Sequence, residues 1–490
     1  MNGTRMPSNE EFDVIIVGAG ISGINAAYRV QSQLPGSTYA ILEARADVGG
    51  TWDLFRYPGI RSDSDLHTFG FPWLPWTEQN PIADGASILN YIKKAATKHG
   101  IDQHYHLHHK VVSGDWSSDT QMWRLTVDTN NGRKYFYARF VILGTGYYDY
   151  EEPLAVTIPG MENFKGTIVH PQFWPEDLEY KDKKIVVIGS GATAITLLPN
   201  LAEKAERVTM LQRSPSYVLS LPQPNKDSWA RRWIPSWILL KLARIQFLIL
   251  PFIFFRLCRA FPNAAKAILR YETTRQLPAN IPHDPHFKPF YNPWEQRLCL
   301  CPDGDFYKSL RDGKADIVTA HIKTVTEHGI LLDSGRNLNA DIIITATGLK
   351  IRLAGGIKLS VDGAEIDFST KFLWRFAMLQ DLPNCNIIIG YTNASWTLGA
   401  DATAILICRL LKYMKDNNIT SAVPRVEYPE TMKAAPALNL NSTYIVKARH
   451  KLPKTGNSGP WKTRDNYFSD YWNGKYADLT DGLEFSTVST

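Results

Sequence analysis

The sequence predicts an α/β fold built on two strand–glycine turn–helix–strand units. The first unit has an apolar run at 12–17, the turn Gly18-Ala19-Gly20-Ile21-Ser22-Gly23, a helix-like stretch and a second apolar run that ends at Glu43. The second unit has a strand at 184–188, the turn Gly189-Ser190-Gly191-Ala192-Thr193-Ala194, a helix and a strand that ends at Arg213. Glycine turns between a strand and a helix are typical of Rossmann-like, dinucleotide-binding domains.

The order of these units predicts that the second domain is inserted into the first. Strands at 140–146 and 341–348 each end in a turn of small residues, where a chain can leave one sheet or enter another. We therefore expect residues 1–150 and 346–490 to form the first domain. Residues 151–345 are expected to form the second, with an apolar helical insertion at about 225–295. Alternating residues on both sides of Asn131-Gly132 predict a β-hairpin.

Composition excludes several classes of protein. Hydrophobic residues make up 44% and charged residues 21% of the 490 residues, which is typical of a folded globular protein. Five cysteines without a C-x-x-C pair argue against a disulfide framework and a zinc ribbon, and they indicate a reducing compartment. Acidic residues precede the first short apolar run, which does not fit a secretory signal. We expect a cytoplasmic location.

The basic residues are concentrated in one apolar stretch. The net charge is 54 − 48 = +6, and the segment 228–271 carries eight Lys and Arg residues and no Asp or Glu. The rest of the chain is then at 6 − 8 = −2, so no general nucleic-acid-binding surface is predicted.

Residues 233–258 lie in this stretch and allow three interpretations. They can form a helical hairpin that is buried or covers the substrate, or an amphipathic patch that faces lipid phosphates and makes the protein membrane-peripheral. A transmembrane helix is disfavoured, because Lys241 and Arg244 would each cost about 2.5 to 3.5 kcal/mol near the bilayer centre.

The two glycine turns predict two different nucleotides. In the first, Gly18 permits the tight turn, Gly20 lets a pyrophosphate approach the backbone, Gly23 lets helix and strand pack closely, and the Glu43 carboxylate can bind ribose hydroxyls. In the second, Gly189, Gly191 and Ala194 take these parts. The following strand ends in Arg213-Ser214 instead of an acid, which favours a ribose 2′-phosphate and therefore NADPH.

One ribose site and one 2′-phosphate site indicate a flavoprotein in which NADPH reduces FAD. Such proteins include disulfide reductases and oxygenases. Cys299 and Cys301 are separated by one residue, too close for an ordinary disulfide, which disfavours a reductase.

The segment between the two glycine turns resembles a family fingerprint. Residues 164–175 (FKGTIVHPQFWP) match F-x-G-x-x-x-H-x-x-x-W-P of type I Baeyer–Villiger monooxygenases. The segments 49–65, 292–298, 342–348 and 390–398 are similar to the ethionamide-activating subgroup of that family, and the first also resembles a long-chain alkane oxidation branch. The resemblance covers essentially the whole chain.

The resemblance implies an enzyme that converts a small hydrophobic ketone to an ester or lactone with O₂ and NADPH, through a flavin C4a-peroxide. Sulfide oxidation is implied as a side activity. A flavin-dependent N- or S-oxygenase or a long-chain alkane hydroxylase is the alternative within flavin chemistry. A membrane-peripheral flavin-binding scaffold without turnover is the alternative from another class.

The resemblance also implies the residues of the site. Contacts to FAD are expected from Gly18, Gly20, Ser22, Gly23, Glu43, Thr51, Trp52, Asp53, Leu54 and the backbone of Val111. Contacts to NADP are expected from Arg61, Ser62, Asp63, Gly189, Ser190, Gly191, Ala192, Thr193, Ala194, Ile195, Thr196, Arg213 and Ser214. Arg297 matches the active-site arginine of the family, and Asp63 matches its carboxylate partner.

Physical chemistry supports these roles. An arginine stays charged at every working pH and can stabilise an anionic oxidant and the tetrahedral adduct that it forms, while Asp63 orients Arg297. His170 is expected to act as a hinge between the nucleotide-binding domains; the alternative is a satisfied linker histidine. Trp396 either closes the flavin pocket or belongs to the core.

Four histidines at 104, 106, 108 and 109 have no carboxylate or thiol at ligand spacing. We therefore expect a solvated strand there and no metal site.

Overall fold

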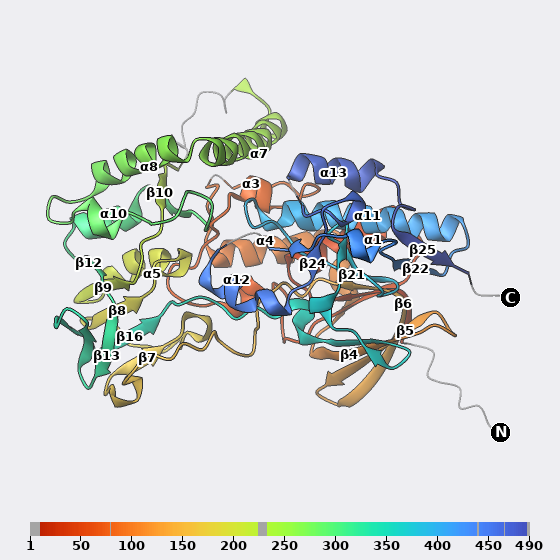
Figure 1. Cartoon of the computed structure of the whole chain (residues 1–490), viewed down its shortest axis with the longest axis horizontal. Coiled ribbons are helices and arrows are strands. Elements are labelled where there is room, and N and C mark those ends of the chain that lie inside the picture. Colours follow the sequence, from red (N-terminus) through yellow and green to blue (C-terminus); the bar gives the residue numbers. More distant parts are fainter. Residues whose placement is uncertain (1–9, 79, 224–232, 439–440, 465, 488–490) are drawn as a thin grey trace.

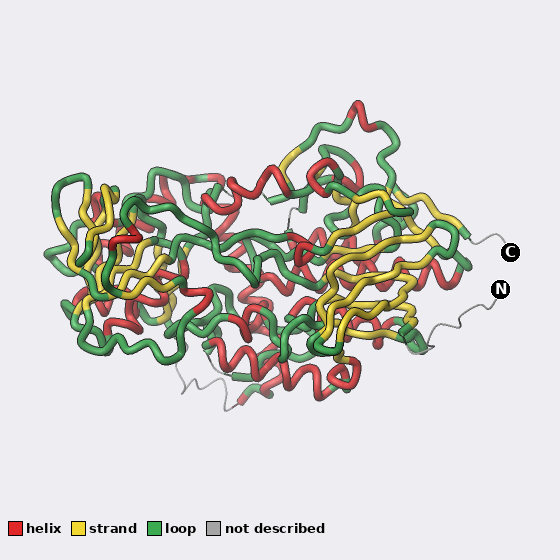
Figure 2. Tube along the Cα trace, turned by 90° about the horizontal axis from the view of Figure 1, so that it is seen from below, coloured by secondary structure: helices red, strands yellow, loops and turns green. Residues whose placement is uncertain are grey.

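The computed structural model describes residues 10–78, 80–223, 233–438, 441–464 and 466–487. Two sheets lie at opposite ends of the long axis, with helices and loops between them (Figure 2). Arg231 and Arg232, which belong to the predicted basic stretch, lie outside the described residues.

The larger sheet forms around the first glycine turn. Its central strands run in the order β21-β6-β1-β2-β3 and are all parallel, and β4 and β5 extend it through an antiparallel meander. The strands are β1 (Glu11–Val17), β2 (Tyr39–Leu42), β3 (Tyr105–His106), β4 (His109–Ser117), β5 (Met122–Thr129), β6 (Gly132–Leu143), β17 (Lys358–Val361), β18 (Ala364–Glu365), β19 (Leu373–Trp374), β20 (Met378–Leu379) and β21 (Cys385–Ile387).

Strand β1 is buried on both faces because its apolar residues alternate between two cores. Val14 and Ile16 pack into the core under the helices α1 (Ile21–Gln33), α4 (Gly85–Lys98) and α11 (Trp396–Asp416). Ile15 and Val17 pack into the core on the opposite face, beneath the meander. Helices α1 and α11 lie against each other on one side of the sheet (Figure 1). Strands that are buried in this way carry near-continuous apolar runs, as the sequence of β1 does.

The predicted hairpin at Asn131-Gly132 is confirmed. Strands β5 and β6 are antiparallel, and Thr129 faces Gly132 at the closing pair.

The smaller sheet forms around the second glycine turn and contains only strands from 167–345. Its order is β12-β9-β8-β16-β7, and every pair is parallel. Helices α5 (Ala192–Ala202) and α10 (Asp305–Arg311) share one core with it, and the small sheet β13-β14-β15 covers the other face. The strands are β7 (Thr167–Val169), β8 (Lys184–Ile188), β9 (Arg207–Gln212), β12 (Ala315–Thr319), β13 (Ile322–Thr326), β14 (Gly329–Leu332), β15 (Asn337–Asn339) and β16 (Ile342–Thr345).

The two sheets together are the predicted α/β fold with two dinucleotide-binding units. The chain leaves the first sheet after β6 and returns to it at β17.

A helical segment follows β10 (Val218–Leu221), as predicted. It contains α7 (Ser236–Ala260), α8 (Pro262–Gln276) and α9 (His283–His286), and β11 (Cys299–Pro302) then pairs with β10. By length and composition alone α7 could cross a membrane, with a mean hydropathy of 2.0 over its most apolar window, yet none of that window is buried in the protein. The prediction that residues 233–258 are buried is therefore wrong, whereas a hairpin that covers the substrate and a patch that faces lipid stay predictions.

The remaining elements complete the first domain and its C-terminal segment. They are α2 (Thr51–Leu54), α3 (Leu66–Phe69), α12 (Thr443–Ala448), α13 (Tyr467–Tyr476), β22 (Ser421–Pro424), β23 (Ala435–Pro436), β24 (Lys454–Thr455) and β25 (Leu483–Ser486). Short 3₁₀ turns lie at 101–104, 161–163, 171–173, 353–356, 368–370, 429–431, 449–451 and 459–461.

Candidate active site

The first glycine turn is shaped by close backbone approach. A Cβ at Gly18, where φ is +99°, would lie 2.8 Å from the carbonyl oxygen of Gly144, and one at Gly23 would lie 1.8 Å from that of Gly18. A Cβ at Gly20, by contrast, would have no neighbour closer than 3.6 Å. The turn is therefore tightly packed at Gly18 and Gly23. It is open at Gly20, at the N-terminus of α1, where a phosphate can approach the backbone.

The buried Glu43 carboxylate lies directly after β2 and against this turn. It accepts hydrogen bonds from the backbone N–H of Ala19 at 2.7 Å and of Arg45 at 2.9 Å. Burial raises the pKa of Glu43, although these two hydrogen bonds oppose the shift. Glu43 is thus held in one orientation beside the turn.

A single cavity gathers residues from the first glycine turn, the segment 49–64 and the second glycine turn. Its lining includes ten predicted site residues, which are Gly20, Ser22, Thr51, Trp52, Arg61, Ser62, Asp63, Ala192, Thr193 and Arg297. Trp396 also lines it, and its indole N–H donates to the Ser22 hydroxyl at 2.8 Å. Ser22 and Trp396 lie 374 positions apart, so the cavity exists only in the folded chain.

Arg297 and Asp63 meet in this cavity, 234 residues apart in sequence. One guanidinium nitrogen of Arg297 lies 3.4 Å from a carboxylate oxygen of Asp63, and Nε donates to the carbonyl of Thr392 at 3.3 Å. Burial by itself would lower the pKa of the Arg297 guanidinium. The electrostatic effect of Asp63 and three nearby tyrosines is larger, so the pKa is raised. Its 35% exposed side chain borders the cavity, where it offers a permanent positive charge.

Three tyrosines surround the guanidinium. Tyr147 and Tyr148 follow β6 and join their hydroxyls at 2.7 Å, and Tyr444 comes from α12 near the other end of the chain. The Tyr147 ring stacks on Trp396 with centroids 4.9 Å apart. Burial raises the pKa of Tyr148 and of Tyr444, so both hydroxyls stay protonated and can donate hydrogen bonds.

The second glycine turn repeats the pattern of the first. A Cβ at Gly189 would lie 2.2 Å from the carbonyl oxygen of Ala346, whereas one at Gly191 would meet nothing within 4 Å. Ser190 donates to the carbonyl of Ser214 at 2.8 Å, which fixes the end of β9 beside the turn. Arg213 is exposed there and forms no ion pair among the described residues.

Arg61 has a partner that the sequence did not indicate. Its guanidinium pairs with both carboxylate oxygens of Asp305, the first residue of α10. The segment 61–65 carries Arg61 and belongs to the first domain, and α10 packs on the smaller sheet. This ion pair therefore joins the two domains at the edge of the cavity.

The fingerprint residues lie outside the cavity. His170 Nδ1 accepts a hydrogen bond from the Gln172 backbone at 3.2 Å, and the Gln172 amide donates to the Asp149 carbonyl at 2.6 Å. The linker into the smaller sheet is thereby tied to the end of the first domain. Burial lowers the pKa of His170, which disfavours its charged form.

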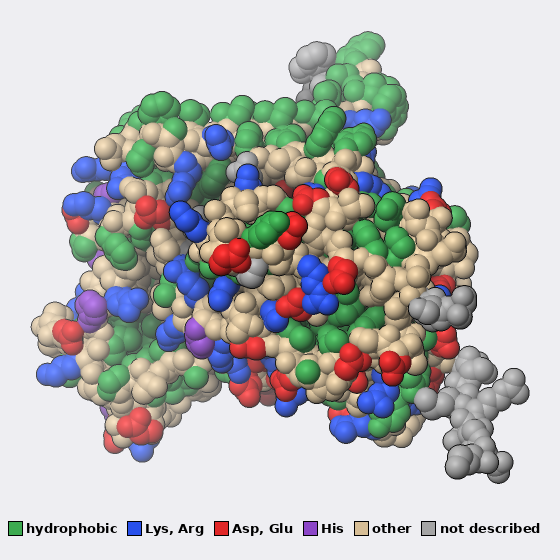
Figure 3. Space-filling model, turned by 45° about the vertical axis from the view of Figure 1, so that its right-hand side comes forward, with side chains coloured by type: hydrophobic (Ala, Val, Ile, Leu, Met, Phe, Trp, Pro, Cys, Tyr) green, Lys and Arg blue, Asp and Glu red, His purple; other side chains and the backbone are tan. Residues whose placement is uncertain are grey.

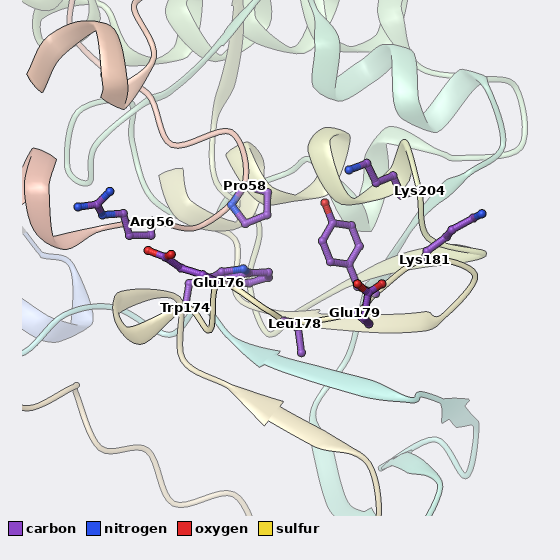
Figure 4. Close-up of a pocket in the computed structure, with 9 residues that line it drawn as sticks. Arg56, Pro58, Trp174, Glu176, Leu178, Glu179, Lys181 and Lys204 are labelled. Atoms are coloured by element: carbon purple, nitrogen blue, oxygen red, sulfur yellow. The ribbon is translucent and has the colours of Figure 1, made fainter. Parts of the chain in front are cut away.

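A second cavity lies beside the fingerprint tryptophan, Trp174 (Figure 4). Glu176, Glu179, Lys181 and Lys204 give it charges of both signs. Neither glycine turn contributes to its lining, so we place the functional site in the first cavity.

Several predicted site residues are buried next to the cavity and do not line it. Asp53 is buried and accepts hydrogen bonds from Arg45 and Arg56, and Val111 is buried in β4. The predicted residues that do not line the cavity are Gly18, Gly23, Glu43, Asp53, Leu54, Val111, Gly189, Ser190, Gly191, Ala194, Ile195, Thr196, Arg213 and Ser214.

The predicted solvated strand at 104–109 is wrong, because a turn at 107–108 separates β3 from β4 and only His108 of the four histidines is exposed. His104, His106 and His109 contact backbone or aromatic neighbours. His104 stacks on Tyr39 with centroids 4.1 Å apart, and His109 Nδ1 contacts the Leu107 carbonyl at 2.7 Å.

Sequence reasoning missed the tyrosines and Asp305. Tyr147, Tyr148 and Tyr150 follow the carboxyl end of a parallel strand, where ligands bind in open α/β sheets, so position could have indicated them. No local pattern marks Tyr444 or Asp305, because their roles come from long-range packing.

The described residues fit a pair of dinucleotides. Each glycine turn leaves the approach to a helix N-terminus open and closes the space behind it. The first turn has an acid beside it and the second an arginine and serine, as FAD and NADP respectively require.

Comparison with known proteins agrees with this geometry. A pyridine nucleotide-disulphide oxidoreductase family model matches residues 15–245, which include both glycine turns. The FAD-containing monooxygenase EthA of Mycolicibacterium smegmatis is 47% identical over 94% of each chain. The probable FAD-binding monooxygenase AlmA of Acinetobacter baylyi is 41% identical over 97% of this chain and 96% of its own.

The chain belongs to the FAD-containing monooxygenases. This confirms the predicted enzyme class, a flavin-dependent monooxygenase, and the predicted cofactor FAD. The fold of this monooxygenase is shared with an oxidized steroid monooxygenase bound to NADP, with a TM-score of 0.74 and 19% identity over 97% of this chain and 99% of that one.

The cysteines agree with an oxygenase. All five are buried and free in the monooxygenase, and burial raises the pKa of Cys299 and Cys301 to about 12. Neither thiol is activated for disulfide exchange.

Proposed function

We propose that this monooxygenase inserts one oxygen atom of O₂ beside the carbonyl of a hydrophobic ketone, giving an ester or lactone, with sulfide oxidation as a side activity. The observation that carries the proposal is the Arg297–Asp63 pair at the cavity. A permanent cation that faces the cavity is what an anionic oxidant and an oxyanion require.

The proposal assigns one nucleotide to each glycine turn. Residues 1–150 and 346–490 would hold FAD, through the Gly18–Gly23 turn and Glu43. Residues 151–345 would hold NADP, through the Gly189–Ala194 turn with Arg213 and Ser214. Bound FAD would supply the hydride acceptance and the O₂ activation that amino-acid side chains cannot.

Arg297 would stabilise negative charge on the reacting oxygen atoms, and Asp63 would fix its orientation. The protonated hydroxyls of Tyr148 and Tyr444 lie near this cation and would add hydrogen bonds to the same anion. Tyr147 would limit the water that reaches the cavity, because its ring covers Trp396.

His170 is proposed as a hinge between the domains. It lies on the linker into the smaller sheet, and its neutral ring accepts a hydrogen bond there and does not contact the cavity. We further propose a cytoplasmic enzyme that makes peripheral membrane contact through residues 233–258, since α7 exposes its apolar side chains.

The test is product analysis with purified enzyme, NADPH, ¹⁸O₂ and a panel of ketones and sulfides. Wild-type enzyme should form labelled ester, and Arg297→Ala should bind FAD normally while ester formation falls about 10²- to 10³-fold or more. The matched control is Arg133→Ala, which removes an exposed arginine that pairs with Asp128 on the β5–β6 hairpin and should keep full activity.

Two results would contradict the proposal. If sulfoxides form and no ketone yields an ester, the enzyme is a heteroatom oxygenase. If Arg297→Ala makes ester at the wild-type rate, another cation stabilises the oxyanion.

A further inference from the structure

Helix α7 turns an apolar face to solvent, which reverses the usual pattern of a surface helix. From Leu242 to Leu257 its exposed residues recur at helical spacing and form one face. The large apolar side chains on this face are 41% to 56% exposed and are Leu242, Ile245, Ile249, Leu250, Ile253 and Leu257, and Trp237, 59% exposed, lies near the N-terminal end of the helix.

The opposite face of α7 is attached to the protein. Arg244 donates to the carbonyls of His67 at 2.5 Å and Gly70 at 3.3 Å, at the C-terminal end of α3. Phe247 stacks on His67 with centroids 5.2 Å apart, and Phe252 meets Phe468 of α13 edge-on. Lipid therefore cannot surround α7, and only its outer face is available to a membrane.

Two further helices extend this outer face. Helices α7 and α13 lie along the same edge of the molecule in Figure 1, and hydrophobic side chains follow the upper edge in Figure 3. Phe261, Ile268 and Tyr271 are 60% to 65% exposed at α8, and Phe468, Trp472 and Tyr476 are 43% to 65% exposed on α13. We call the exposed apolar residues of α7, α8 and α13 the apolar edge.

Cations accompany the apolar edge. Lys241 and Arg256 are exposed on α7 and form no ion pair among the described residues, and Lys241 lies 5.1 Å from the Trp237 ring. The segment 228–271 contains no acid, although Glu295 lies near Arg259 and Lys266. Tryptophan and tyrosine beside lysine and arginine suit the headgroup region of a membrane, and the cations suit anionic lipid.

The apolar edge also lies next to the active site. Helix α3 contacts α7 through His67, and Phe69 at the end of α3 lines the cavity that holds Arg297 and Asp63. Helix α3 therefore lies between α7 and the cavity.

We propose that the apolar edge docks in the interface of an anionic lipid bilayer, with α7 parallel to the membrane plane, so that a ketone dissolved in the bilayer reaches the cavity past α3. The choice of a ketone as substrate rests on the function proposed above, whereas docking to the membrane is independent of that function.

The first experiment measures co-sedimentation of the full-length holoenzyme with vesicles. Wild-type enzyme should bind vesicles of phosphatidylglycerol and phosphatidylcholine at least tenfold more tightly than vesicles of phosphatidylcholine alone. An alkaline carbonate wash should release it. Ile249→Glu/Ile253→Glu should bind anionic vesicles at least tenfold more weakly, and Lys241→Gln/Arg256→Gln should lose the preference for them.

A matched control separates lost apolar surface from changed charge. Tyr135→Glu/Tyr428→Glu adds the same two negative charges at residues 46% and 59% exposed, which lie outside α7, α8 and α13. This control should bind vesicles within about twofold of wild type. Equal losses in the two double variants would overturn the docking surface.

The second experiment compares two ketones by kcat/KM. The Ile249→Glu/Ile253→Glu variant should lose at least tenfold on a long-chain ketone supplied in vesicles and keep its activity on a short, water-soluble ketone. Ester formation from neither ketone by wild type would refute the proposed function and leave the vesicle binding to be judged separately.

Three outcomes would overturn docking. The first is that the enzyme does not sediment with vesicles, and the second is that it stays on them after the carbonate wash, which would indicate a transmembrane helix. The third is that wild type is an oligomer in sedimentation velocity and Ile249→Glu/Ile253→Glu dissociates it, which would assign the apolar edge to a second copy of the chain.

Discussion

The guanidinium of Arg297 is held from two sides. Asp63 lies on the loop before α3, whereas Thr392 precedes α11. The contact with Asp63 is 3.4 Å long and that with Thr392 is 3.3 Å, so neither is a short hydrogen bond. Orientation by Asp63 is therefore mainly electrostatic.

Changing Asp63 to Asn should disturb the orientation of Arg297 and leave flavin binding unchanged. Asn keeps the size of the side chain but removes the negative charge that helps to raise the pKa of Arg297. We expect kcat for ester formation to fall about 10- to 100-fold while the flavin spectrum is unchanged. Steady-state kinetics with one ketone will measure this, and a wild-type kcat would remove Asp63 from the site.

Asp65 makes stability depend on pH. It caps α3, accepting from Thr68, and burial raises its pKa from 3.8 to about 6. Because the pKa of this acid is higher in the folded state, protonated Asp65 stabilises the folded protein below about pH 4. This contribution to the free energy of unfolding is lost as the pH rises through 6. Asp65→Asn keeps the cap without the titration.

We therefore expect the free energy of unfolding of Asp65→Asn, relative to that of wild type, to increase by about 1 kcal/mol as the pH rises from 5 to 7. Thermal unfolding, followed by tryptophan fluorescence at both pH values, measures the difference. Asp84→Asn is the control, because Asp84 caps α4 with a lowered pKa and should show no trend in this range. A parallel trend in both variants would contradict the assignment.

At the scale of elements, α7 depends on few contacts with the rest of the molecule. Arg244 donates two hydrogen bonds at the C-terminal end of α3. Phe247, Phe252 and Phe255 make aromatic contacts, and Cys258 is buried. An element with little buried surface opens locally at a low free energy.

Arg244→Gln should loosen α7 in solution. Hydrogen bonds that involve a charged group contribute about 1.5 to 3 kcal/mol, so amide exchange across 236–260 should accelerate about 10- to 100-fold. Hydrogen–deuterium exchange with mass spectrometry measures it. Lys241→Gln on the same helix should leave the exchange unchanged, because Lys241 is exposed and makes no ion pair. Equal protection in both variants would show that the aromatic contacts alone hold α7.

At the scale of the whole molecule, the cavity lies where the two domains meet. The first domain supplies the segment 49–64, and the second supplies Ala192 and Thr193. The Arg61–Asp305 ion pair connects the domains there, so Asp305 competes with any phosphate that Arg61 would bind.

Asp305→Asn should therefore bind NADP⁺ about 3- to 10-fold more tightly, since Arg61 no longer has to leave a carboxylate. Isothermal titration of the FAD-loaded enzyme measures the Kd. Asp312→Asn is the control, because Asp312 follows the other end of α10 and pairs with Lys308. Weaker binding in Asp305→Asn would show that Asp305 positions Arg61 instead of competing for it.

Local sequence patterns determined the two glycine turns, the hairpin at Asn131-Gly132 and the helical segment after β10. Each depends on backbone conformation or apolar periodicity over a few neighbouring residues, so neighbouring residues suffice to predict it. Family resemblance then indicated Arg297 and Asp63 as a pair, although nothing in either local segment shows that they meet.

Only the tertiary structure decided which groups surround that pair and which face of α7 is exposed. Tyr444 lies near Arg297 and Asp305 pairs with Arg61 through contacts between distant segments, and no local rule encodes such contacts. The outward face of α7 was also undetermined by its sequence, because the orientation of the helix follows from where Arg244 meets the carbonyls of His67 and Gly70 at the end of α3.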